Sequence, residues 1–236
     1  MFPPMTKFYS TLIGALWLCS PILTAHAQQM PPGMVKYQMV FLRNAANTNL
    51  PPAETSKMQE AHLALLAKLN RERVNLLYGH FLDKTDLRGI VVLDLPDAEA
   101  ARKALAEDPL VQTGHFLVDV KPWLCQTNMF SLPETPSVPE QLVFGFLMRG
   151  TNPTQVVAGA ENIQAGHLAY MGELHKQGKL LAAGPFADRS DWRGIVIYRV
   201  GSVEEARTLA AGDPAVKAGR LTLDARPWMT FKGILK

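Results

Sequence analysis

Two histidines, His62 and His167, are the residues of this sequence best suited to proton transfer. They stand 105 residues apart, at equivalent places in an internal repeat, and each lies on the apolar face of a predicted helix. Because imidazole changes its charge near neutral pH, a positioned histidine can act as a general acid or base. A hydrogen-bonded core histidine without catalytic function is the alternative at both positions.

Asp108 and Asp213 are the acids that could pair with these imidazoles. Each precedes a proline, just past the second predicted helix of its repeat, where an aspartate commonly bonds nearby backbone in a turn. If the carboxylate also reaches the histidine, it would hold one ring nitrogen and make the other a better proton acceptor. Because 46 residues separate His62 from Asp108, spacing alone does not show this approach.

Three further residues are candidates for substrate binding. Arg88 and Arg193, each before a glycine at the start of a predicted strand, could pair with a substrate carboxylate. Ion pairs with the nearby Asp86 and Asp191 are the alternative. Tyr170, on the same helical face as the second histidine, is the third candidate. No cofactor or metal is expected, because the sequence has no Gly-rich phosphate loop, no nucleophile elbow and no Cys/His cluster at zinc spacing.

Residues 1–27 are predicted to be a secretory signal peptide. Lys7 precedes an apolar run, and Ala25-His26-Ala27 is a small-x-small cleavage site. Pro21 interrupts the run, which disfavours a membrane-anchoring helix. Cleavage after Ala27 predicts a periplasmic or secreted protein without a membrane anchor. Cys125 would then be the only cysteine, so we expect a partly buried free thiol and no internal disulfide.

The composition is that of a folded domain. The chain of 236 residues is 47% hydrophobic and 19% charged, with a formal net charge of +3. No basic stripe runs along it, so nucleic-acid binding is not expected. The expected partner is a small-molecule ligand, and further self-association is left open.

An internal repeat organises the chain. Residues 36–123 align with residues 141–228 without a gap, and 29 of the 88 pairs are identical. Residues 124–140 between them contain three prolines and suit an extended connector. The sequence therefore predicts two modules and one linker.

Both modules show the same order of predicted elements, which is βαββαβ, the ferredoxin-like order. The first module has predicted strands at 37–42, 75–82 and 87–95, a helix at 54–73, a helix from Asp97 to Asp108 and a last strand. The second module has predicted strands at 142–148, 180–187 and 192–200, a helix at 159–178, a helix from Ser202 to Asp213 and a last strand. Proline after each aspartate should end the second helix.

Such a sheet carries both helices on one face and leaves its other face uncovered. Two sheets that face each other would cover both. We therefore expect an α+β fold in which the tandem ferredoxin-like modules form an intramolecular dimeric α+β barrel. Two independent modules, each pairing with another chain, are the alternative.

The second module resembles the YCII-related (YciI-like) domain throughout its length. The motifs that carry the resemblance are Gly166-His167-Leu168-Ala169-Tyr170, the run from Gly178 to Phe186, Arg193-Gly194-Ile195, Ser202-Val203-Glu204-Glu205-Ala206 and the run from Asp213 to Leu221. The first module is similar more loosely. It keeps His62-Leu63, Gly79, Arg88-Gly89-Ile90 and Asp108-Pro109, and departs from the pattern at His80, Gln112 and His115.

This resemblance implies the dimeric α+β barrel, shared with muconolactone isomerase-like proteins, and a His–Asp site on His167 with Asp213 and on His62 with Asp108. The activity associated with the family is removal of chloride from a chlorinated hydroquinone. We expect an exported small-molecule enzyme of lyase or isomerase type, in which Asp213 orients His167 and the first module supplies a second site. A periplasmic ligand-binding or assembly module with structural histidines is the alternative.

Overall fold

The computed structural model describes residues 33–45, 51–132, 138–151, 160–188 and 190–236. The predicted signal peptide, residues 1–27, lies outside the described residues, as does the middle of the predicted connector. Within the described part, no helix is long and apolar enough to cross a membrane.

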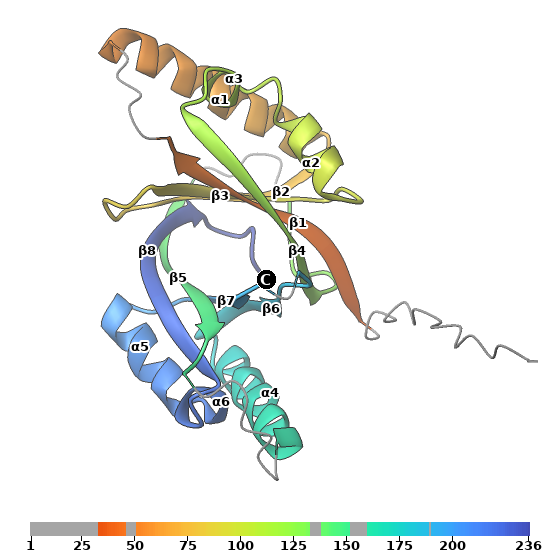
Figure 1. Cartoon of the computed structure of the whole chain (residues 1–236), viewed down its shortest axis with the longest axis vertical. Helices are drawn as coiled ribbons and strands as arrows, with labels where there is room; N and C mark the ends of the chain where they lie inside the picture. Colours follow the sequence, from red (N-terminus) through yellow and green to blue (C-terminus); the bar gives the residue numbers. More distant parts are fainter. Residues whose placement is uncertain (1–32, 46–50, 133–137, 152–159, 189) are drawn as a thin grey trace, which may run out of the picture. The chain divides into compact units, whose positions relative to one another are not determined.

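The two modules repeat one order of elements (Figure 1). The first contains β1 (Met34–Asn44), α1 (Pro52–Arg71), β2 (Asn75–Phe81), β3 (Leu87–Leu93), α2 (Ala98–Ala104), α3 (Pro109–Gln112) and β4 (Phe116–Gln126). The second contains β5 (Pro139–Arg149), α4 (Ala160–Lys176), β6 (Leu180–Pro185), β7 (Trp192–Tyr198), α5 (Val203–Gly212), α6 (Pro214–Lys217) and β8 (Leu221–Phe231). The predicted order is confirmed, and β4 and β5 extend into the two ends of the segment predicted as a connector.

The second helix of each module differs from the prediction. It ends at Ala104 in the first module and at Gly212 in the second, and Pro109 and Pro214 begin a further short helix instead of only ending one. Proline lacks an amide hydrogen and has a fixed φ, both of which suit the first turn of a helix.

All eight strands form one antiparallel sheet in the order β4-β1-β3-β2-β8-β5-β7-β6. The modules join where β2 pairs with β8, at His80–Met229 and Phe81–Trp228. A ladder between the modules means that they are not independent, so the alternative of two separate modules is wrong.

The two edge strands of this sheet also meet. Trp123 of β4 forms a bridge with Phe186, directly after β6, and its indole Nε1 donates to the Gly184 carbonyl at 3.1 Å. The sheet is therefore nearly closed, and the predicted intramolecular α+β barrel is confirmed.

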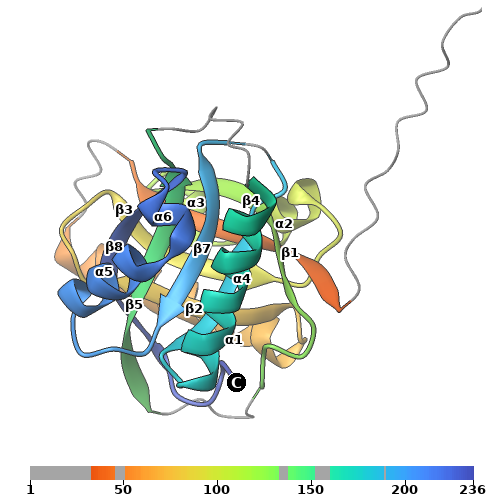
Figure 2. The same cartoon turned by 90° about the horizontal axis from the view of Figure 1, so that it is seen from below.

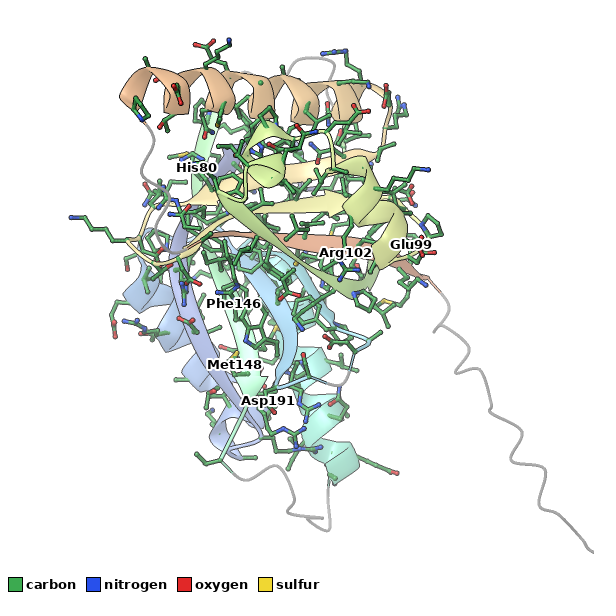
Figure 3. The ribbon with its side chains drawn as sticks, turned by 45° about the horizontal axis from the view of Figure 1, so that its top comes forward. His80, Glu99, Arg102, Phe146, Met148 and Asp191 are labelled. Carbon is green, nitrogen blue, oxygen red and sulfur yellow. The ribbon has the colours of Figure 1, made fainter. Side chains whose placement is uncertain are left out.

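Apolar side chains fill an inner layer that both modules share. Its largest fully buried members are rings from both halves, namely Phe41, Phe81, Trp123, Phe144, Phe146 and Trp228. Figure 3 labels Phe146, which lies between the two sets of strands. Two outer layers are local, one between the first module's strands and helices and one in the second module. Figure 2 shows α4, α5 and α6 of the second module in front of the strands that they cover.

Candidate functional site

In the first module the fold brings His62 and Asp108 together. Nδ1 of His62 lies 2.5 Å from Oδ2 of Asp108, and the carboxylate is fully buried. The other oxygen, Oδ1, accepts a hydrogen bond from the Leu110 amide at 3.0 Å and so caps α3. One carboxylate therefore combines the predicted turn role with the predicted contact to histidine.

The second module repeats this arrangement. Nδ1 of His167 lies 2.7 Å from Oδ2 of the fully buried Asp213, whose Oδ1 accepts from the Ala215 amide at 2.8 Å. The imidazole is more accessible here, since the His167 side chain is 14% exposed and the His62 side chain 6%. A small molecule therefore reaches the second imidazole more easily.

Both pairs lie in the helical layer, outside the shared inner core. His62 lies on the face of α1 that also buries Leu66 and Leu69. Its ring meets Phe116 edge-on, with 5.6 Å between the ring centroids. In the second module α4 and α6 approach closely, because a side chain on Gly166 would meet Pro214 at 3.2 Å. The short helix that begins at proline is therefore what carries each aspartate to its histidine.

The contact to aspartate settles which ring nitrogen is available. An ionised carboxylate only accepts hydrogen bonds, so the neutral imidazole carries its proton on Nδ1 and presents the lone pair of Nε2. Neither Nε2 bonds to any described residue. Each site can therefore accept one proton at Nε2 and return it.

Arg88 and Arg193 occupy a repeated irregularity of the sheet. Leu42 pairs with Gly89 while Arg43 pairs with Leu87, so Arg88 is the extra residue of a β-bulge in β3. The second module has the same shift, which leaves Arg193 as the extra residue in β7. Bulges often re-aim a side chain beside an active site.

The ion pairs that the sequence suggested for these arginines are not formed. Asp86 pairs with Arg43 at 2.8 Å and Asp191 pairs with Arg149 at 2.9 Å. Arg88 and Arg193 have no ion-pair partner among the described residues, which leaves both guanidinium groups available to a ligand.

Tyr170 is engaged within the protein. Its hydroxyl donates to the Leu209 carbonyl at 2.8 Å. The structure therefore directs the Tyr170 hydroxyl to the end of α5, whereas the sequence suggested contact with substrate.

Other reactive side chains do not join the two sites. Nδ1 of His175 bonds the Leu180 carbonyl at 2.9 Å, a local contact at the end of α4. Burial raises the pKa of the Cys125 thiol to about 12, so this thiol stays protonated at neutral pH. The described residues contain no group of three potential metal ligands.

Tyr198 and Gly212 lie near Asp213 and were missed by the sequence reasoning. The signal that could have found them is in the repeat, because the first module has Leu93 and Glu107 at these positions. Comparing the modules for differences, as well as for identities, would have singled them out.

The comparisons with known proteins agree with this fold. The family model of the YCII-related domain matches residues 37–124 and 146–228. The chain belongs to the YCII-related domain family. Both YCII-related segments contain a His–Asp pair. No curated protein matches the chain.

Several solved structures share the barrel of this YCII-related chain. A proposed chlorite dismutase has a TM-score of 0.55 and 9% identity, over 83% of this chain and 94% of that one. A heme-binding protein from Thermus thermophilus has a TM-score of 0.54 and 11% identity, over 84% and 92%. A proposed monooxygenase from Lactobacillus acidophilus has a TM-score of 0.50 and 14% identity, over 85% and 98%. At such identities the likeness shows the fold alone.

Haem, which one of these structures binds, does not fit the described residues of the YCII-related chain. The inner layer is filled by fully buried rings such as Phe41 and Phe144, and the outer layers by buried side chains such as Val40 and Val196. A porphyrin in any of these layers would displace packed side chains.

Proposed function

We propose that this YCII-related protein is an exported small-molecule enzyme of lyase or isomerase type that needs no cofactor. The observation that carries the proposal is the His–Asp pair, built twice, with Nδ1 bonded to a buried carboxylate and Nε2 without a hydrogen bond to any described residue. A histidine held in this way is suited to general acid–base catalysis. Export through the signal peptide at 1–27 is part of the same proposal.

His167 is the general base and Asp213 fixes its orientation. Nε2 takes a proton from the substrate, while Asp213 keeps Nδ1 protonated and stabilises the imidazolium that forms. Arg193, the bulge residue of β7, has no ion-pair partner among the described residues and is our candidate for binding a carboxylate or ring oxygen of the substrate, although no contact between described residues joins it to the His167–Asp213 pair. The His62–Asp108 pair with Arg88 is the second, less accessible site.

Two reactions fit this chemistry. In loss of HCl from a chlorinated hydroquinone, one hydroxyl proton leaves as H⁺ through Nε2. The other is transferred to the carbon that carries chlorine, and chloride leaves with the bonding pair to give a quinone. In a lactone isomerisation, Nε2 removes a C–H proton and returns it to another carbon. Neither reaction consumes an external oxidant or reductant.

The experiment uses one probe for each reaction and two matched variants. The full chain is incubated with chlorohydroquinone, followed by chloride release, and with a five-membered enol lactone in D₂O, followed by deuterium incorporation. We expect turnover of at least one probe. His167→Gln should lower it roughly 100-fold or more, the usual contribution of a general base, and His62→Gln should lower it much less.

Two results would overturn the catalytic proposal. One is the absence of turnover with both probes. The other is turnover that both histidine variants leave unchanged while they lower the melting temperature. Either result would favour the alternative, a ligand-binding module with structural histidines. The low exposure of the His62 side chain is the observation that supports this alternative. That alternative predicts binding of small aromatic or lactone ligands without conversion.

A further inference from the structure

The two modules differ at three positions that surround the buried aspartate of the second. The second module has Tyr170, Tyr198 and Gly212, where the first module has two leucines and a glutamate. These three positions lie on three elements, α4, β7 and α5. Tyr170 lies against Gly212, which immediately precedes Asp213, and packs against the buried cluster that contains Tyr198.

Tyr170 and Gly212 fit each other directly. A Cβ atom on Gly212 would collide with Oη of Tyr170, so the phenol occupies the room that the missing side chain leaves. Glutamate at this position, as in the first module, would exclude it. The phenol oxygen therefore sits against the residue that immediately precedes Asp213.

The hydroxyl of Tyr170 also satisfies the end of α5. It donates to the Leu209 carbonyl, one of the last four of the helix, which have no partner inside the helix. The equivalent helix of the first module, α2, ends at Ala104, the counterpart of Leu209. In the second module α5 continues to Gly212, so that Asp213 ends α5 and also caps α6.

Tyr198 belongs to the buried cluster of the second module against which Tyr170 packs. It is fully buried, and its hydroxyl has no hydrogen-bond partner among the described residues. Burial raises the pKa of Tyr198, and the charges of Asp213 and Tyr170 raise it further. A leucine, as in the first module, would avoid burying an unpaired hydroxyl.

We propose that Tyr170 is a positioning residue for the Asp213–His167 pair and that Tyr198 holds the Tyr170 ring in place. The Tyr170 hydroxyl extends α5 to Asp213 and so sets where the carboxylate meets the imidazole. The Asp213–His167 contact is 2.7 Å, and its counterpart without phenols is 2.5 Å. The inference rests on the proposed function of the pair and names the second module as the working one.

The test removes one hydroxyl and reads both imidazoles in one spectrum. Tyr170→Phe keeps the ring, so ring-current effects stay the same. Long-range ¹H–¹⁵N spectra of the full chain should show the His167 nitrogen signals shifted toward those of His62, with the His62 signals unmoved. Tyr198→Phe should shift His167 in the same direction by a smaller amount. Tyr37→Phe, a remote hydroxyl of the first module, should shift neither.

Hydrogen exchange separates positioning from a purely structural role. Tyr170→Phe should speed exchange of the amides in the last turn of α5 and also move the His167 signals. If exchange alone changes, Tyr170 only stabilises the helix and the inference is overturned. If Tyr170→Phe moves the His167 signals although His167→Gln leaves turnover intact, Tyr170 positions the pair but the proposed function fails. An unmoved His167 signal beside a histidine-dependent turnover refutes this inference alone.

Discussion

Each buried aspartate divides its two oxygens between two tasks. Oδ1 of Asp213 caps α6, and Oδ2 bonds Nδ1 of His167. Asp108 repeats both contacts in the first module. Because the cap fixes the carboxylate on backbone, the imidazole meets an acceptor that has little freedom to turn. The same position of each carboxylate therefore serves both the structural role, which is the helix cap, and the chemical role, which is the bond to histidine.

Replacing one oxygen should reverse the histidine tautomer. In Asp213→Asn, the side-chain oxygen can keep the helix cap while the amide nitrogen faces His167. This nitrogen only donates, so Nδ1 must accept and the ring proton moves to Nε2. We expect ¹⁵N spectra to show a protonated Nε2 on His167 and an unchanged His62, with a loss of turnover on the order of 100-fold or more.

Asp108→Asn is the matched control, since it should reverse His62 and leave His167 as it is. Each variant should therefore change the imidazole signals of its own module and leave those of the other module unchanged. A His167 ring that keeps its proton on Nδ1 in Asp213→Asn would show that the carboxylate does not determine the tautomer.

Among the elements, the last strand of each module reaches the hairpin of the other. Nζ of Lys121 on β4 lies 2.6 Å from Asp188 and 3.2 Å from Ser190, in the hairpin between β6 and β7. Its counterpart Arg226 on β8 donates to Thr85 at 2.8 Å and lies 3.5 Å from Asp83, in the hairpin of the first module. These two contacts tie the modules together on either side of the barrel.

The Lys121–Asp188 contact should contribute stability that depends on pH. Burial opposes ionisation of Asp188, but bonds from Lys121 and Ser190 outweigh it and hold its pKa below the usual 3.8. A lowered pKa means that the contribution is present above the unfolded value and is lost as pH falls through the folded one. A double-mutant cycle of Lys121→Met and Asp188→Asn should give a coupling of about 1 kcal/mol at neutral pH and almost none once Asp188 is protonated.

The exposed pair Arg207–Glu204, at neighbouring turns of α5, is the control for this cycle. Its coupling should not exceed about 0.5 kcal/mol, as for other helix surface pairs. Equal coupling in both cycles would mean that the contact between modules adds nothing beyond a surface ion pair.

The order of elements followed from the sequence because periodicity and repeat are local signals. Ser202 and Asp97 cap their helices as predicted, with bonds to Glu205 and Ala100. These local signals did not predict which ion-pair partner each charged side chain has. Arg88 stands two residues from Asp86, yet Asp86 pairs with Arg43 of the neighbouring strand β1, 43 residues away in the sequence. The approach of each histidine to its aspartate was likewise only a conditional prediction, because the two partners are 46 residues apart in the sequence.

For the molecule as a whole, the inner core makes the modules interdependent. Phe146 of the second module lies 5.9 Å from Phe41 and 6.0 Å from Phe81 of the first, measured between ring centroids. Neither module covers this aromatic face alone, so separating them would expose a large apolar surface to water. The repeat predicted such a shared face, but which rings meet depends on the two junctions that close the sheet.

This interdependence predicts one cooperative unfolding transition. Leu69 and Leu174 are equivalent, identical and buried in the outer core of the first and second module respectively. Leu→Ala at either position should cost about 2–5 kcal/mol. If the modules unfold only together, each variant should lower the protection of the slowest-exchanging amides equally in β1 and in β5, far from the substitution. Protection lost only in the substituted module would mean that each half unfolds alone, and that the shared core couples them less than its packing indicates.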